Sequence, residues 1–291
     1  MALALQGGAF AAFRRLLDTP MSSGTRRAGS FGGLWDRVIP GLTVSSSAVA
    51  FTQLRLALRS PRGRATMFTP VLMPLLLTGL VLKRGANVPF LPTGSPGLGL
   101  AAFGCGVSIL ALLPLAMNQF AIDKAGFTRQ MLLPLSLGEL LAGKAVGNAL
   151  IAAVPAAFCF VLPAVVFPGG HPGLWAAIPI ALVAVYCLFA PAAAAFSAIF
   201  PKVADLNSIG NRGNAHQAAG LLGMLCLGIS VAPCALLTLV ALRGFHRPDL
   251  VPVLLLVWCA IAFGMSQLLF IPVRRLVANR CETLGKYSET S

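Results

Sequence analysis

Few side chains in this sequence have the types and spacing that catalysis requires. His171, His216 and His246 stand apart in three different polar stretches, and no two carboxylates follow one another closely enough to suggest an acid and base pair. General acid–base and nucleophilic catalysis both need such partners within hydrogen-bond reach. We therefore expect no enzymatic activity in this chain.

One stretch imitates a phosphate-binding loop. Gly138–Lys144 matches G-x-x-x-x-G-K, but Ala145 stands where the motif requires a Ser or Thr to bind magnesium. The context also differs, because Ser136 and Glu139 form an S-x-x-E capping box that predicts the start of a helix at this point. We expect no ATPase in the chain itself.

The cysteines add no recognisable chemistry. No two have the C-x-x-C spacing of a metal or redox site, and six of the seven fall within long apolar runs. We expect them to pack as small apolar side chains, and we expect no metal and no other cofactor. These six residues are Cys105, Cys159, Cys187, Cys226, Cys234 and Cys259; Cys281 lies near the C-terminal end.

The elements that carry these residues are six long apolar runs. Hydrophobic residues make up 57% of the chain and charged residues 10%. Lys144 lies near the start of the third run, and we count its charge with the connection that precedes this run. Runs of about 20 apolar residues predict membrane-spanning helices. The fold class is therefore all-α, a polytopic membrane protein with six spans. The runs are Ala65–Leu82, Leu98–Met117, Leu140–Phe167, Gly173–Phe200, Ala218–Leu242 and Leu250–Val273.

The cations indicate the orientation of the spans. Of 22 Lys and Arg residues, 18 fall before the first span, after the last, or in the second and fourth connections, and 4 fall in the alternate connections. Cytoplasmic connections carry the excess of Lys and Arg, so both termini should be cytoplasmic, in an inner or plasma membrane. The net charge of +14 is an orientation signal, and nucleic-acid binding is not expected.

The segments outside the spans have different characters. Residues 1–45 are rich in Gly, Ser and Arg, a composition that predicts a mobile cytoplasmic leader. We expect residues 61–275 to form the six-span domain and residues 276–291 to form a cytoplasmic tail. Between leader and spans, residues 46–60 predict an amphipathic helix, with Ala50, Leu54, Ala57 and Leu58 on one face and Thr52, Arg55 and Arg59 on the other. Such a helix can lie flat on membrane lipid or act as a solvated linker.

Uncharged polar side chains within or beside the spans are the remaining candidates. Most are expected to form hydrogen bonds between packed helices. They are Ser108, Asn118, Asn148, Ser197, Ser230, Thr238, Ser266 and Gln267.

The connection between the second and third spans is the most informative polar stretch. Charged residues, among them Asp123 and Arg129, alternate there with apolar ones such as Phe127 and Leu132. An element of this kind can dock in a protein groove or lie at the lipid interface, and the pattern alone does not choose between them.

This connection resembles the membrane subunits of type-two ABC exporters. It reads N-x-F-x-x-D-x-x-G-F from Asn118 to Phe127, followed by Leu133-Pro134 and by Gly143-Lys144. Phe200–Asp205 and Arg59–Arg62 also resemble segments of that family, and the resemblance covers residues 46–275. It implies a permease that works with a separate ATP-binding cassette subunit, as a homodimer or heterodimer of permeases.

The resemblance also implies a role for two cytoplasmic segments. Ser46–Arg59 would be the surface helix that precedes the first span, and Phe120–Pro134 the coupling segment that docks into the ATP-binding subunit. The main alternative is a non-transporting membrane scaffold or assembly factor. The residues expected to take part in partner coupling are Asn118, Phe120, Asp123, Gly126, Phe127, Arg129, Leu132 and Pro134.

Overall fold

The computed structural model describes residues 37–84, 95–122, 130, 134–202 and 216–289, and every regular element in these ranges is helical. The chain divides into two units, residues 1–37 and 38–291, and all the helices named here belong to the second. Residues 1–36 of the expected mobile leader lie outside the described residues.

Six helices are long and apolar enough to cross a membrane. Each corresponds to one predicted run, and their membrane-spanning portions are 21 to 32 residues long, against the roughly 20 that a bilayer requires. The prediction of six spanning helices is confirmed, and the protein is a polytopic integral membrane protein. The helices are α3 (Pro61–Arg84), α4 (Pro96–Ala116), α6 (Leu137–Val166), α7 (Pro172–Ile199), α8 (Gln217–Leu239) and α9 (Leu250–Glu289).

Two of these helices depart from the predicted limits. A π-helical turn, η3 (Val240–Gly244), follows α8 directly. The last helix, α9, continues well past Val273 to Glu289, because its C-terminal part is amphipathic: Val273 and Val277 are buried while Arg274 and Arg275 are exposed. The segment predicted as a tail therefore begins as part of α9.

A shorter helix, α2 (Val44–Arg59), precedes the spans. Thr43 caps its first turn by accepting a hydrogen bond from the backbone N–H of Ser46, and Ser60 ends it. Pro61 then begins α3, a position at which proline costs no helical hydrogen bond. The face that carries Ala50 and Ala57 is buried, whereas Leu58, expected on the same face, is 44% exposed.

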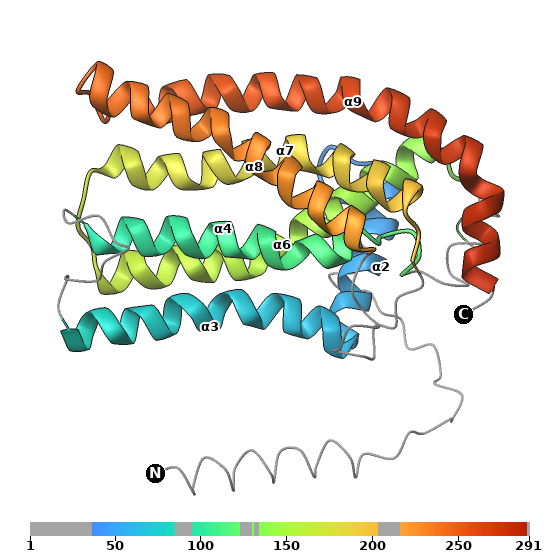
Figure 1. Ribbon diagram of the computed structural model, residues 1–291, viewed down its shortest axis with the longest axis horizontal. Helices are drawn as coiled ribbons and strands as arrows, with labels where there is room; N and C mark the ends of the chain where they lie inside the picture. The colour runs from blue at the N-terminus through green and yellow to red at the C-terminus, as the bar shows by residue number, and fades with distance from the viewer. Residues whose placement is uncertain (1–36, 85–94, 123–129, 131–133, 203–215, 290–291) are drawn as a thin grey trace, which may run out of the picture. The chain divides into compact units, whose positions relative to one another are not determined.

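The spans run antiparallel in chain order, so that the start of α3 and the end of α9 lie at the same end of the bundle (Figure 1). The short helix α2 packs across this end, against α6 and α3. We call this end the α2 end. Within the bundle, α4 contacts α3, α6 and α7, while α7 also packs on α8 and α9. In Figure 1, α3 and α9 lie along opposite edges.

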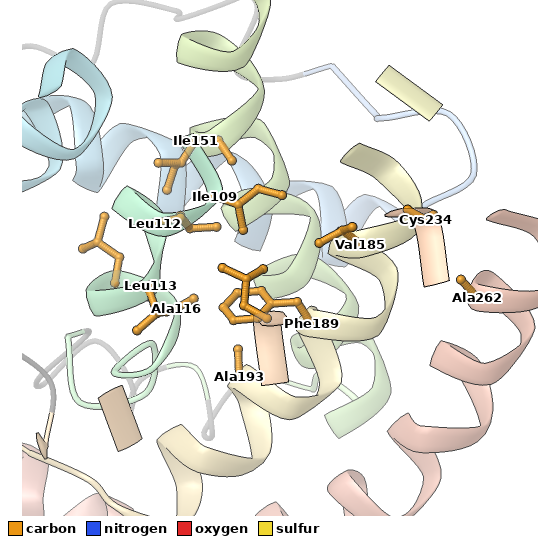
Figure 2. Close-up of a cluster of buried hydrophobic side chains, with 14 of the residues drawn as sticks. Ile109, Leu112, Leu113, Ala116, Ile151, Val185, Phe189, Ala193, Cys234 and Ala262 are labelled. Carbon is orange, nitrogen blue, oxygen red and sulfur yellow. The ribbon is translucent and has the colours of Figure 1, made fainter. Parts of the chain in front are cut away.

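Phe189 of α7 lies in the main core of the bundle. Its side chain is fully buried and points toward α4, whose residues Leu112, Leu113 and Ala116 line the facing surface (Figure 2). Ile151 of α6 and Cys234 of α8 belong to the same cluster. Small residues on α7, among them Ala184 and Ala193, allow these helices to pack closely, as in membrane bundles generally.

Candidate functional site

Five polar side chains from four elements gather inside the α2 end of the bundle. We call this group the polar cluster. Polar groups that leave water must find partners, because lipid and apolar side chains offer none. Its members are Gln53 of α2, Gln119 of the turn after α4, Lys144 and Asn148 of α6, and Ser197 of α7.

A chain of amides joins three of these elements. Nε2 of Gln53 donates a hydrogen bond of 3.0 Å to Oδ1 of Asn148, and Nδ2 of Asn148 donates one of 2.9 Å to Oε1 of Gln119. Asn148 and Gln119 are both buried, at 2% exposed each. The Asn148 amide thus uses its oxygen toward α2 and its nitrogen toward the turn after α4, and it fixes both relative to α6.

Lys144 supports the same turn from one helical turn earlier in α6. Its side chain is fully buried. Nζ donates a hydrogen bond of 3.0 Å to the backbone carbonyl of Gln119 and lies 5.6 Å from the centroid of the Phe120 ring. A buried ammonium is tolerated where oxygen acceptors and an aromatic face compensate for the lost water. The carbonyl and the ring therefore hold the cation, and the cation holds the turn.

The turn that follows α4 is also bound to α7. Its residues Asn118 and Phe120 are both buried. The backbone N–H of Phe120 donates a hydrogen bond of 3.2 Å to Oγ of Ser197, and Oδ1 of Asn118 accepts one of 3.4 Å from the backbone N–H of Lys202. Both contacts fall at the last turn of α7 or directly after it. A displacement of the turn would therefore be transmitted to α6 and α7 together.

Close backbone packing fixes α2 against α6. A Cβ atom at Gly143 would lie 2.6 Å from the carbonyl oxygen of Ser46, and one at Gly147 would lie 2.9 Å from Cβ of Gln53. Cβ atoms do not approach other non-bonded atoms so closely, so a larger residue at either position would force α2 and α6 to shift. The two glycines lie one helical turn apart on α6, and together they form a shallow seat for α2.

The first turn of α6 adds hydrogen bonds at the entrance to this seat. The predicted capping box is confirmed: the backbone N–H of Glu139 donates to Oγ of Ser136, and the backbone N–H of Ser136 donates to Oε2 of Glu139. Glu139 also accepts from α2 and its cap, through Thr43 Oγ1 at 2.9 Å and Ser46 Oγ at 3.0 Å. Glu139, in the first turn of α6, therefore also positions the beginning of α2.

The structure describes three of the predicted coupling residues. Asn118 and Phe120 are buried within the turn after α4, so any part they take in partner coupling is to position the segment that follows. Pro134 is exposed. Asp123, Gly126, Phe127, Arg129 and Leu132 lie outside the described residues, and their role stays a prediction.

Lys144 was expected in the connection before the third span, and this was wrong. The residue lies inside α6 and inside the protein, because the helix begins at Leu137 and turns this position toward the turn after α4. Gln53 and Gln119 were not among the candidates. Asn148 and Ser197 were expected to make hydrogen bonds between elements, and they do.

The cluster is suited to positioning rather than to chemistry. Its five members carry amides, one hydroxyl and one ammonium, with neither a carboxylate nor a thiol, so they supply no acid and base pair. Nor do any three His, Cys, Asp or Glu side chains gather as metal ligands would in the part of the chain that the structure describes.

No protein-family model, no curated protein and no solved structure matches this chain. The resemblance to type-two ABC exporters therefore depends on the sequence segments alone.

Proposed function

We propose that this chain is the permease subunit of an ATP-driven exporter and that it works with a separate ATP-binding cassette subunit. The proposal starts from a polytopic membrane protein with six spanning helices. The second support is the resemblance of residues 46–275 to the exporter permeases, whose partner subunit hydrolyses ATP.

The single observation that supports it best is the amide chain from Gln53 through Asn148 to Gln119. A permease driven from outside the membrane must transmit a displacement of its coupling segment to its spans. The predicted coupling segment starts at Phe120, and the turn containing Phe120 is bonded to α6, to α7 and, through Asn148, to α2. A partner that moved this segment would move three helices at once.

The distribution of cations supports a cytoplasmic position for this end of the bundle, where ATP is available. Arg59, Arg64, Arg274 and Arg275 are exposed at the α2 end, where Arg55, Arg62, Lys202 and Arg280 also lie. The described cations at the other end are Lys83, Arg84, Arg243 and Arg247. Under the positive-inside rule the α2 end is cytoplasmic. A cytoplasmic ATPase would then meet the coupling segment directly.

One observation favours the alternative of a non-transporting scaffold. The core around Phe189 fills the space between α4, α6 and α7 with apolar side chains (Figure 2). A polar substrate would have no hydrophilic path through that part of a single bundle. A scaffold needs no such path, because its partners bind its connections.

Co-purification separates the two proposals. The tagged full chain, expressed in its native host and purified in mild detergent, should bring down an ATP-binding cassette subunit with ATPase activity. Replacing both Phe127 and Leu132 with Asp should remove that subunit, because charges would replace the apolar residues expected to enter its groove. A matched control with Asp at Val44 and Leu58, which are exposed on α2, should retain it.

Two results would contradict the permease proposal. One is a wild-type chain that brings down no ATPase, and the other is a double-Asp variant that brings it down at the wild-type yield. Either would favour the scaffold.

A further inference from the structure

The outward face of α9 carries a polar residue that the bundle leaves without a partner. Buried residues of α9, such as Leu255, Ala262 and Ser266, face the rest of the protein. Ala260, Gly264, Gln267 and Ile271 recur at spacings of three and four on the opposite side, and all four are exposed. We call these four residues the outer face of α9. The helix lies along one edge of the bundle (Figure 1).

Gln267 is the unusual member of this face. Among the described residues, its amide makes no hydrogen bond, and its side chain is exposed. Asn148, another amide within a span, uses both its oxygen and its nitrogen inside the protein. Gln267 is one of eight polar residues of which most were expected to form hydrogen bonds between packed helices, but the structure turns it outward.

The position of Gln267 along α9 places it within the hydrocarbon layer. Exposed Arg274 and Arg275 mark the level at which α9 reaches the membrane surface, and Gln267 precedes Arg274 by seven residues. At 1.5 Å per residue this is about 10 Å, in a layer about 30 Å thick. A glutamine side chain is too short to reach the headgroups from that depth. Its donor and acceptor therefore face lipid tails, which supply neither, and polar groups in that setting drive helices to associate.

The same face allows a second helix to approach closely. A Cβ atom at Gly264 would meet no other atom within 4 Å, and Ala260 lies one turn before it. Two small residues four positions apart let the backbones of two membrane helices come together. Gln267, less than one turn beyond Gly264, would then lie within reach of a group on the approaching helix.

We propose that the outer face of α9 binds the same face of a second copy of this chain, with the two Gln267 amides hydrogen-bonded to each other across a twofold axis. A twofold axis brings identical patches into contact. An amide is its own complement, because it carries both a donor and an acceptor. A lipid tail offers nothing to either group, whereas a second copy satisfies both. The proposal requires only that the protein spans a membrane, so it does not depend on the exporter function.

Self-association of the purified full chain in phosphatidylcholine vesicles tests this. Energy transfer between two labelled populations, followed as lipid dilutes the protein, should report a dimer. Gln267→Leu removes both amide hydrogen bonds and should weaken the apparent association constant about tenfold, as expected for interhelical bonds in membranes. Gly264→Ile should weaken it at least as much by keeping the backbones apart. Gly79→Ile is the matched control, since this exposed glycine of α3 also meets nothing within 4 Å of its would-be Cβ, and it should leave the dimer unchanged.

Crosslinking locates the contact. Under mild oxidation Gly264→Cys should form a disulfide-linked dimer, whereas Gly79→Cys and the wild type should not. All these substitutions lie on exposed positions, so near-wild-type thermal unfolding should confirm that the variants fold. A wild-type chain that stays monomeric at every dilution would overturn the proposal. So would Gln267→Leu and Gly264→Ile variants that associate as the wild type does, or equal crosslinking at Gly79 and Gly264.

Discussion

Asn148 and Gln119 are joined by a 2.9 Å hydrogen bond between Nδ2 of the first and Oε1 of the second. The bond links the first half of α6 to the turn after α4, and the oxygen of the same Asn148 amide accepts from Gln53 of α2. One buried side chain therefore connects three elements that are far apart in sequence. We therefore expect a substitution of Asn148 to lower the free energy of unfolding more than the loss of a polar side chain that bonds within one helix.

Asn148→Leu should destabilise the protein by about 1 to 3 kcal/mol. Leucine has a similar volume, but it leaves the nitrogen of Gln53 and the oxygen of Gln119 without partners in a buried site, and that is the usual cost of an unsatisfied group. The free energy of unfolding in detergent measures the effect. Thr238→Val is the control, because Thr238 bonds only within α8, to the carbonyl of Cys234, and its loss should cost less than about 0.5 kcal/mol. Equal losses for both variants would show that the amide chain does not stabilise the fold.

Gly143→Ala and Gly106→Ala should have opposite effects on the free energy of unfolding. Alanine favours a helix over glycine by about 1 kcal/mol. At Gly106 nothing lies within 4 Å of the new Cβ, so this gain should be realised. At Gly143 the new atom would lie 2.6 Å from Ser46 O and 2.7 Å from Val49 Cβ, and overpacking of that kind costs about 1 to 3 kcal/mol.

The sign of the difference is the test. Denaturant unfolding of both variants in the same detergent should give a more stable Gly106→Ala protein and a less stable Gly143→Ala protein. If Gly143→Ala were also stabilised, α2 would not be seated on α6 as the structure has it.

The six spanning helices could be predicted because the thickness of the bilayer sets the length of an apolar run, and this length can be counted in the sequence. The end of α9 could not be predicted in this way. Beyond Val273 the helix continues as an amphipathic segment whose Arg280 donates hydrogen bonds to the carbonyls of Ala198 and Ile199 at the end of α7. The length of an apolar run does not reveal that contacts with another helix extend α9 beyond it.

The polar cluster was only half foreseen for a related reason. Asn148 and Ser197 attract notice as polar residues in apolar runs. Lys144 looks like part of a connection, and one group that holds it inside the protein is a backbone carbonyl, which no side-chain spacing reveals. For Gln267 the sequence shows a polar residue within a span, but it does not show that the side chain points outward. That direction depends on which side of α9 packs against α7.

The distribution of cations predicts which end of the bundle faces the cytoplasm. Lys and Arg are retained on the cytoplasmic side during insertion. Apart from Lys144, which lies inside α6, 17 of the other 21 fall in the segments that the sequence predicts to be cytoplasmic. A cysteine at Val44, 71% exposed at the start of α2, should therefore react with a membrane-impermeant thiol reagent only after cells are opened. A cysteine at Gly169, exposed between α6 and α7 with nothing within 4 Å of its would-be Cβ, should react in intact cells. The wild type, whose own seven cysteines are buried or half-buried, supplies the background. Labelling of Val44→Cys in intact cells, with Gly169→Cys protected, would show that the orientation is opposite to the predicted one. The coupling segment would then lie on the side of the membrane away from any cytoplasmic ATPase.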